Sequence, residues 1–273
     1  MAVVAPAEEV VYYPLAPAQG RLYRELHAAG TGELAAVLVD RRREVPYIHI
    51  FALLTRLKQA CDHPALLEPG WSSEEPGKYE VLDEILDEAL EAGRRVVVFS
   101  QYVAMIELLS QHLARRRVAH LVMTGRTRQR AQVVERFNGG EGEPVLLASL
   151  LASGVGIDLT AASVVVHYDR WWNPAREDQA SDRVHRIGQR HAVRIVRLVT
   201  VDTIEERIEA LLESKRSLAR DVVAPTAEVL QRLTREELAA LLGISLAPAA
   251  MATEPPRTAG TAPPPRRGRR FSA

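Results

Sequence analysis

Apolar positions along the chain follow two patterns in turn. Segments with apolar residues at helical spacing alternate with short runs of consecutive aliphatic residues, such as VVVFS at residues 96–100. A run without polar alternation is typical of a strand buried on both faces. The strands predicted in this way span residues 96–100, 120–123, 145–149, 164–168 and 193–199, with helices at 79–92, 103–117, 128–138, 174–187 and 203–220. Repeated strand–helix–strand units predict an α/β fold with a doubly wound parallel sheet and helices on both faces.

Helical patterns also flank this alternation. Residues 17–29 and 47–61 are predicted to form helices, as is 234–242, where Thr234 and Glu237 fit a capping box. A polar, turn-rich segment at 71–77 marks a boundary before the main domain. We therefore divide the chain into a helical N-terminal extension (1–77), a main domain (78–223), a helical closure (224–243) and a disordered tail rich in proline and arginine (244–273).

Composition narrows the class of protein. The 273 residues carry 35 basic and 35 acidic side chains, and 47% are hydrophobic, as expected of a globular chain. Only Lys58, Lys78 and Lys215 are lysine, which leaves 32 arginines. Arginine binds phosphates in a bidentate fashion, although a genomic bias toward arginine explains most of these residues equally well. The single Cys61 excludes an internal disulfide and a multi-cysteine metal site, so no metal is expected.

The sequence also bears on location. No segment has the length of a membrane span, and residues 1–10 lack the basic and apolar regions of a signal peptide. We expect a cytoplasmic protein without a membrane partner, associated with the nucleoid if the source is prokaryotic.

Polar residues follow the ends of four predicted strands. They are Ser100 and Gln101, Thr124 to Thr127, Ser149 to Asp158, and Asp169 to Asn173. Ligands of parallel sheets bind beyond the carboxyl ends of the strands, so we expect these loops to share one edge.

Two of these loops carry candidate ligand contacts. Gly154 and Gly156 would let a ligand approach the backbone, although an ordinary tight turn is the simpler alternative. Asp158 and Thr160 would contact a ribose hydroxyl or a phosphate, or would cap the next turn. The Thr124–Thr127 segment fits either a phosphate nest or a helix start capped by Thr127.

The helix predicted at 174–187 carries the strongest candidates. Asn173 and Pro174 suit its beginning, and Gly188 its end. On a continuous helix, Gln179, Arg183 and Arg186 stand at i, i+4 and i+7, so one amide and two guanidinium groups would share a stripe suited to an anionic ligand. A solvated face with salt bridges from Glu177, Asp178 and Asp182 to these arginines is the alternative.

Aromatic and histidine residues nearby are less decisive. Trp171 and Trp172 are adjacent, so we expect one to pack in the core and the other to anchor the loop or contact a partner. His185 and His191 have no partner at metal or triad spacing and are expected to be structural or exposed.

Several segments together resemble a known family. These are VVVFSQY at 96–102, ERFN at 135–138, LLASGVGIDLTAA at 150–162 and HYDRWWNPAREDQASDRVHRIGQ at 167–189. They resemble the second RecA-like lobe, the helicase C-terminal domain, of SWI/SNF-type ATP-dependent DNA translocases. VYYPLAPAQGRLYREL at 11–26, LLTRLKQACDHPALL at 53–67 and TIEERIEALLESKRSLARDVV at 203–223 extend the resemblance to about residues 10–243.

The resemblance implies roles for individual residues. Gln179, Arg183 and Arg186 match the family's last motif, in which the two arginines reach across the interlobe cleft to the ATP phosphates. Residues 149–160 match the motif that contacts the DNA backbone and couples it to the nucleotide. This motif implies cofactor contacts for Gly154, Gly156 and Asp158, and DNA contacts for Ser149 and Thr160. Trp172 matches a tryptophan associated with the same coupling, and Ser100 and Gln101 match a loop near the DNA strand, so DNA contacts are implied for these residues as well.

One turn departs from the family pattern. The family usually has Asp-Gly-Ser or Asp-Gly-Thr where this chain has Thr124-Gly125-Arg126, so the resemblance implies DNA contact for Thr124 and Gly125 less directly. The implied partners are double-stranded DNA, a nucleoprotein complex and a Walker-motif lobe in cis or trans.

Motifs of the first lobe are absent from the sequence. There is no G-x-x-x-x-G-K-[ST] and no DEAH-like acidic run, so ATP and Mg²⁺ would be held only together with another lobe. We expect little or no ATPase activity from the chain alone. A catalytically inactive fragment that binds DNA or a protein is the rival hypothesis, and an RNA helicase lobe is disfavoured by WWNP and HRIGQ. A start just before the interlobe segment suggests a split gene or a misplaced start codon.

Overall fold

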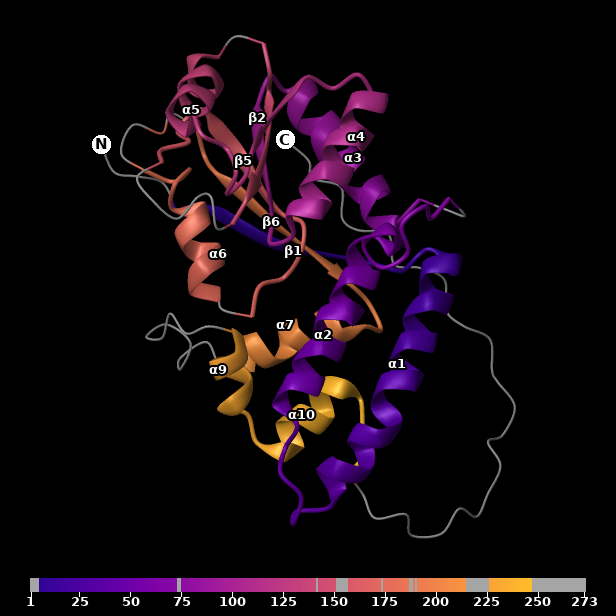
Figure 1. Cartoon of the computed structure of the whole chain (residues 1–273). Coiled ribbons are helices and arrows are strands. Elements are labelled where there is room, and N and C mark those ends of the chain that lie inside the picture. The colour runs from indigo at the N-terminus through magenta and orange to yellow at the C-terminus, as the bar shows by residue number, and fades with distance from the viewer. Residues whose placement is uncertain are drawn as a thin grey trace, which may run out of the picture.

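A six-stranded, all-parallel sheet forms the centre of the computed structural model (Figure 1). The structure describes residues 5–72, 75–140, 142–150, 157–172, 174–186, 189, 191–214 and 226–246. The strands are β1 (Ala7–Tyr13), β2 (Arg95–Ser100), β3 (His120–Met123), β4 (Val145–Ser149), β5 (Ala162–His167) and β6 (Arg194–Thr200), in the order β1-β6-β5-β2-β4-β3. The predicted parallel α/β sheet is therefore confirmed, and the five predicted strands lie within about two residues of their expected bounds.

Helices cover both faces of this sheet, and a further group of helices lies below the ends of its strands in Figure 1. They are α1 (Pro17–Val39), α2 (Tyr47–Asp62), α3 (Gly77–Glu91), α4 (Val103–Arg115), α5 (Arg130–Gly139), α6 (Pro174–Ser181), α7 (Ile204–Ser214), α9 (Thr226–Gln231) and α10 (Arg235–Leu242), with a short 3₁₀ turn at Pro64–Leu66. None of the helices in the described ranges is long and apolar enough to cross a membrane.

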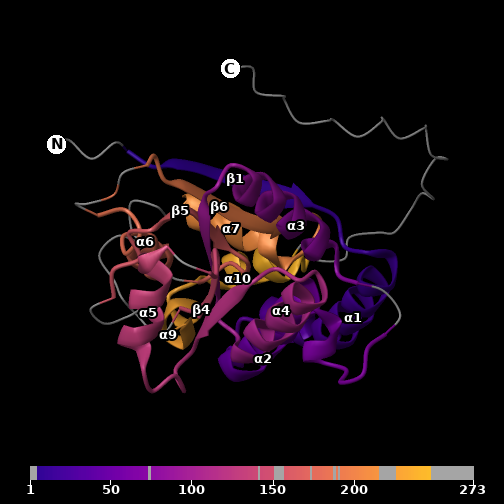
Figure 2. The ribbon, with the colours of Figure 1, turned by 90° about the horizontal axis from the view of Figure 1, so that it is seen from above.

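Strand β2 shows why the strands lack polar alternation. Val96 and Val98 pack with α3 and α4 on one face, whereas Val97 and Phe99 pack with α5 and α6 on the other, and all four are fully buried. Seen from above, the two pairs of helices lie on opposite sides of the strands (Figure 2). Both faces are therefore core, as the continuous apolar run predicted.

A third apolar core lies in a helical layer at the carboxyl end of the sheet. Helices α1, α2, α7, α9 and α10 gather below the strands in Figure 1, around buried residues such as Leu54, Leu57 and Ile208. The capping box predicted at the last of these helices is present, because Glu237 N donates to Thr234 Oγ1 (3.1 Å) and Thr234 N to Glu237 Oε2 (2.8 Å). The N-terminal and C-terminal segments thus build one layer together.

Two elements were not predicted from the sequence. Strand β1 lies inside the segment expected to be helical or irregular, and it pairs in parallel with β6, from Ala7 opposite Arg194 to Tyr13 opposite Thr200. As an edge strand it has two glutamates near its beginning, of which Glu8 is exposed, and only the short run VVYY at its end resembles the apolar runs of the other strands. Helix α9 was missed because six residues are too few for a clear helical period.

The helix expected at 174–187 is wrong in its second half. Helix α6 ends at Ser181, and residues 182–186 form successive turns, so Arg183 and Arg186 do not share a helical stripe with Gln179. The carbonyl of Arg183 accepts Leu159 N–H (2.8 Å), and that of Val184 accepts the Gln189 side-chain amide (3.2 Å). Because these carbonyls bond to other segments, they do not continue the α-helical ladder. The expected cap Asn173 and stop Gly188 lie outside the described residues.

Candidate functional site

The structure separates the predicted site residues into two groups. Ser100, Thr124 and Ser149 lie at the carboxyl ends of β2, β3 and β4, as expected. Asp158 and Thr160 instead precede β5 at its amino end, where Ala162 N donates to Leu159 O (3.1 Å). Arg183 and Arg186 join this second group. Gly154 and Gly156 lie outside the described residues.

Ser100 anchors the loop that follows β2. Its hydroxyl donates to Asp169, and it accepts Tyr102 N–H (3.1 Å), while Gln101 N donates to Asp169 Oδ1 (3.1 Å). Ser100 is fully buried, so it has no surface for a DNA strand in this conformation. Gln101 is half-buried and is the member of the pair that reaches the surface. Burial raises the pKa of Asp169, and the nearby Lys58 ammonium opposes that shift.

The turn after β3 is closed by its own threonines. Thr124 N donates to Thr127 Oγ1 (3.0 Å), Arg126 N to Thr124 Oγ1 (3.3 Å) and Thr127 N to Thr124 O (3.1 Å). Helix α5 begins only at Arg130, with Gln129 at the N-cap position, so the expected cap by Thr127 is wrong. Thr127 instead fixes a turn with Gly125 exposed at its tip.

Ser149 ends β4 with an unsatisfied hydroxyl. The residue is 2% exposed, and its Oγ has no hydrogen-bond partner among the residues that the structure describes. Unsatisfied buried polar atoms are uncommon. This one lies immediately before the segment whose glycines are outside the described residues.

The two arginines differ in their surroundings. Arg186 forms an ion pair with Asp158, and the two side chains are 46% and 53% exposed. The Arg183 backbone carbonyl is fixed by Leu159, but its guanidinium has no ion pair among the described residues, and its Nε is buried without a partner. In the same part of the chain, neither arginine pairs with Glu177, Asp178 or Asp182, the acids expected of a merely solvated helix face.

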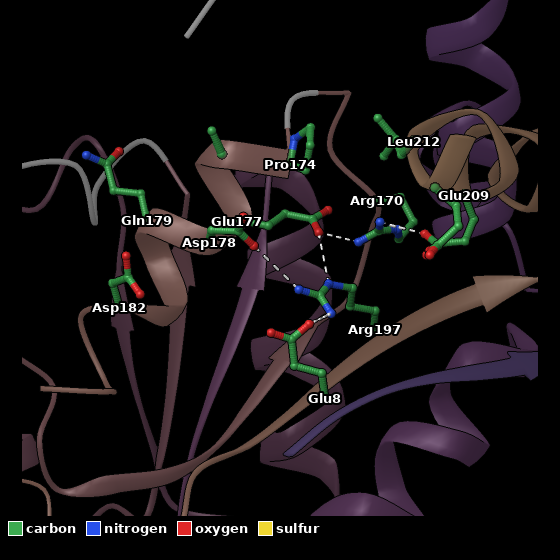
Figure 3. A pocket seen from close by; sticks show the side chains of 12 residues that line it. Glu8, Arg170, Pro174, Glu177, Asp178, Gln179, Asp182, Arg197, Glu209 and Leu212 are labelled. Atoms are coloured by element: carbon green, nitrogen blue, oxygen red, sulfur yellow. Dashed lines mark hydrogen bonds and ion pairs between the residues drawn. The ribbon is translucent and has the colours of Figure 1, made fainter. Parts of the chain in front are cut away.

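Gln179 lines a pocket of about 300 Å³ between α6, α7 and the sheet. Six carboxylates and two arginines line it, namely Glu8, Glu177, Asp178, Asp182, Glu209, Glu213, Arg170 and Arg197. Figure 3 shows Gln179 apart from the network of ion pairs formed by Glu8, Arg170, Glu177, Asp178, Arg197 and Glu209. The excess of carboxylates makes this pocket unsuited to a phosphate, so the phosphate-binding candidates are the two arginines outside it.

Glu177 organises this pocket. It pairs with Arg170, accepts Trp171 N–H (2.6 Å) and lies 3.3 Å from Arg197 Nε (Figure 3). Burial alone would raise the Glu177 pKa, but the charge of Arg170, with smaller contributions from other groups, lowers it overall. Arg170 also pairs with Glu209 of α7 (2.5 Å). Arg170, in the segment after β5, therefore forms ion pairs with α6 and α7, and Glu177 connects it further to Arg197 of β6.

The adjacent tryptophans pack into different cores. Trp172 is 4% exposed and belongs to the helical layer, whereas Trp171 is half-buried against the face covered by α5 and α6. Lys58 of α2 lies over the Trp172 ring, with Nζ 5.9 Å from the ring centroid, and donates to the Arg170 carbonyl. The residue expected to contact DNA thus touches the helical layer and connects it to the β5 loop.

A buried ionic cluster was missed by sequence reasoning. Lys78 Nζ lies 2.7 Å from Asp62, 2.6 Å from Glu205 and 2.9 Å from the Tyr168 carbonyl, and all three charged side chains are fully buried. Burial lowers the Lys78 pKa, but the two carboxylates outweigh it and raise the pKa well above its usual value. The available signal was weak: lysine is rare in this chain, and Lys58 lies within an apolar helical pattern, but Lys78 follows the polar segment SEEPG.

The three histidines near the site differ in burial. His191 is exposed and His185 half-buried, and the described residues contain no cluster of three or more metal-ligating side chains. His167 is fully buried on β5, with Nε2 2.9 Å from Ser181 Oγ and its ring stacked on Phe99.

We predict that stability falls as pH decreases from about 6.5 to 4. Burial lowers the His167 pKa to about 4, whereas the unfolded chain titrates near 6.5, so the unfolded state binds the extra proton in this window. The loss amounts to roughly 3 kcal/mol for this group. Urea unfolding at several pH values should show a flatter pH dependence for His167→Phe, whereas His191→Gln should follow the wild type. An unchanged slope in His167→Phe would contradict the assignment.

Known proteins that are similar to this chain share its C-terminal helicase domain and its fold. Residues 77–188 match the helicase conserved C-terminal domain. The chain is 34% identical over 230 residues to an uncharacterized ATP-dependent helicase of Mycoplasma pneumoniae, covering 84% of this chain and 22% of that protein. It is 36% identical over 189 residues to human SWI/SNF-related matrix-associated actin-dependent regulator of chromatin subfamily A member 1, covering 64% and 18%. The chain thus spans about a quarter or less of these curated relatives.

Solved structures of similar proteins match over most of the chain. The C-terminal domain of the Sulfolobus solfataricus SWI2/SNF2 ATPase is 30% identical, with a TM-score of 0.70. The match includes 88% of this chain and 100% of that domain. The ATPase core of that archaeon in complex with double-stranded DNA is 32% identical with a TM-score of 0.73, and this chain covers half of it.

Proposed function

Since this chain belongs to the SWI2/SNF2 family of ATP-dependent helicases and forms the C-terminal RecA-like lobe of such an ATPase, we propose that it supplies the arginines and the DNA-backbone contacts of a composite ATPase site. The observation that carries the proposal is the state of Arg183 and Arg186. One guanidinium lacks a counter-ion among the described residues, and the other is half-exposed. Both are suited to a phosphate presented from outside the chain.

The proposed nucleotide is ATP with Mg²⁺, and this chain would contribute only part of its site. ATP would supply the transferable γ-phosphoryl group, and Mg²⁺ would neutralise its charge. The phosphate-cradling loop and the metal ligands would come from another RecA-like lobe, in the same polypeptide or in a second one, because this sequence has no Walker-type motif. Arg183 and Arg186 would stabilise the negative charge that develops on the phosphoryl oxygens.

Asp158 has a positioning role in this proposal. Its ion pair holds Arg186 at the amino end of β5 before the nucleotide arrives. Exposed ion pairs contribute little to stability, so a phosphate with two or three negative charges would displace the carboxylate readily. Gly154 and Gly156 remain proposed nucleotide contacts, and Gln179, which lines the acidic pocket, remains one only for a part of the nucleotide other than its phosphates.

The proposed nucleic acid is double-stranded DNA. Gln101, Gly125 and Thr160 are the accessible members of the predicted contact set, whereas Ser100 and Trp172 are buried and would act by holding their loops. Contacts to phosphates carry no sequence information, so the affinity should fall steeply with salt and depend little on sequence. The similar archaeal ATPase core, whose structure contains double-stranded DNA, supports this choice of ligand.

A chimaera tests the proposal. The C-terminal domain of the Sulfolobus ATPase core would be replaced by this chain, which matches all of it. We expect DNA-stimulated ATP hydrolysis by the chimaera and little or none by the chain alone. A chimaera that folds and binds DNA but hydrolyses no ATP would favour the rival hypothesis, a non-catalytic DNA- or protein-binding module.

A further inference from the structure

A basic groove lies where the N-terminal strand and the helical layer meet, and neither Arg183 nor Arg186 lines it. It has a volume of about 580 Å³ and is lined by the loops that follow β1 and β6 and by the first turns of α1 and α7. Its charged lining is Arg21, Arg24, His27 and Arg207, with Asp202 as the acid. This composition is the reverse of the acidic pocket around Glu177.

The topology explains why the groove is electropositive. Strands β1 and β6 are parallel neighbours, and each is followed closely by a helix, α1 from Pro17 and α7 from Ile204. Tyr23 of α1 accepts Ile204 N–H of α7 (2.7 Å), so the beginnings of the two helices lie together. Both helix N-termini carry a partial positive charge, which adds to that of the arginines. Figure 1 shows both helices beneath these two strands.

The arginines of the groove have no counter-ion in the part of the chain that the structure describes. Among the described residues, Arg21, Arg24 and Arg207 form no ion pair, although many other arginines of the chain do. The Asp202 backbone N–H donates to the carboxylate of Glu206 (2.8 Å), one of the two glutamates in the first turn of α7. Uncompensated guanidinium groups gathered in one groove are typical of a site for an anion.

Two of these guanidinium groups lie close to glycines. A Cβ at Gly20 would lie 3.3 Å from Arg24 Nη1, so the absence of a side chain lets Arg24 fold back over the first turn of α1. A Cβ at Gly243 would lie 2.8 Å from the Arg207 guanidinium, which packs against the end of α10. Arg207 Nη1 is buried there without a hydrogen-bond partner in the described part of the chain. The Arg207 guanidinium is therefore packed against the protein, whereas Arg24 is exposed.

We propose that this groove binds phosphate groups of a polyanion, either the backbone of double-stranded DNA or a free phosphate compound. A volume of about 580 Å³ accommodates several phosphate-sized groups. The site is separate from Arg183 and Arg186 and needs no ATP and no second lobe. Phosphate binding in this groove is therefore independent of the proposed ATPase role of the arginine pair.

The test uses the whole chain of 273 residues and two probes. Calorimetry with inorganic pyrophosphate and fluorescence anisotropy with a mixed-sequence duplex at several salt concentrations would compare wild type with Arg21→Ala/Arg24→Ala. Arg56→Ala is the matched control, because Arg56 is also an exposed helical arginine without an ion pair among the described residues. Arg207→Ala is a second variant, checked for folding by its thermal unfolding.

We expect the double variant to weaken pyrophosphate binding at least tenfold, with the control unchanged. Each lost phosphate contact should reduce the slope of log K against log salt by about 0.9, so the duplex slope should fall by about 2 if DNA occupies the groove. Lost pyrophosphate binding with an unchanged duplex slope identifies a free phosphate compound as the ligand. Unchanged binding of both probes in both variants overturns the proposal.

Discussion

Arg186→Ala should reduce the DNA-stimulated ATP hydrolysis of the chimaera by a factor of about 10³ to 10⁵, the range found when an arginine finger is removed. This corresponds to about 4 to 7 kcal/mol of transition-state stabilisation. The side chain is half-exposed and its only ion pair in the described part of the chain is with Asp158, so the substitution removes no packing and should leave folding intact. Affinity for the duplex should change little, because Arg186 is not among the proposed DNA contacts.

Two further variants make the Arg186 result specific. Arg186→Lys keeps the charge but loses the planar fork, and it should recover only a small part of the rate. Arg176→Ala removes an arginine of the neighbouring helix α6, one without an ion pair among the described residues, and should hydrolyse ATP at close to the wild-type rate. Wild-type turnover in Arg186→Ala would remove the basis for assigning a catalytic role to this arginine pair.

Lys78→Met should lower the free energy of unfolding by about 3 to 5 kcal/mol, the range measured when one partner of a buried ion pair is removed. The substitution leaves the Asp62 and Glu205 carboxylates fully buried without the ammonium group that lies 2.7 and 2.6 Å from them. Burial raises the pKa of Asp62 well above its usual value, and the charge of the Lys78 ammonium opposes that shift. Such a loss is a large fraction of the roughly 5 to 15 kcal/mol typical of a folded domain.

Chemical denaturation measures this effect, and a compensating variant separates charge from shape. Combining Lys78→Met with Asp62→Asn and Glu205→Gln removes the uncompensated charges and should recover a substantial part of the stability. Glutamine at position 205 keeps an acceptor for Thr200 N and Oγ1, both of which donate to Glu205. Arg41→Ala, which breaks an exposed pair with Glu236, should change stability by no more than about 1 kcal/mol. A loss in Lys78→Met as small as that of this control would contradict the argument.

The buried cluster also connects the two proposed sites. Lys78 belongs to α3, Asp62 to α2, and Glu205 to α7, whose first turn borders the basic groove. Lys78 and Lys58 both donate to backbone carbonyls of the segment after β5, at Tyr168 and Arg170. That segment leads directly into α6 and the arginine turns. Because buried ion pairs tolerate little displacement, the helical layer and the β5 loop should move as one body.

The sequence by itself determined that the sheet is parallel and where five of its strands lie. Continuous apolar runs are typical of strands that are buried on both faces, and this local signal located β2 to β6. The alternation of these strands with helices predicted that the strands are parallel. The family motifs likewise depend on local residue identity, so they identified the C-terminal lobe before its structure was described. Capping at Thr234 was predictable for the same reason, since both partners lie within four residues.

Only the tertiary structure decided where the site residues lie. Strand β1 forms because β6 offers it a partner nearly 190 residues away, and α6 ends at Ser181 because Leu159 and Gln189 take the carbonyls that a longer helix would use. The Arg186–Asp158 pair, the buried Lys78 and the basic groove at Arg207 all join residues far apart in sequence. Such contacts depend on which surfaces meet, and no local periodicity encodes that.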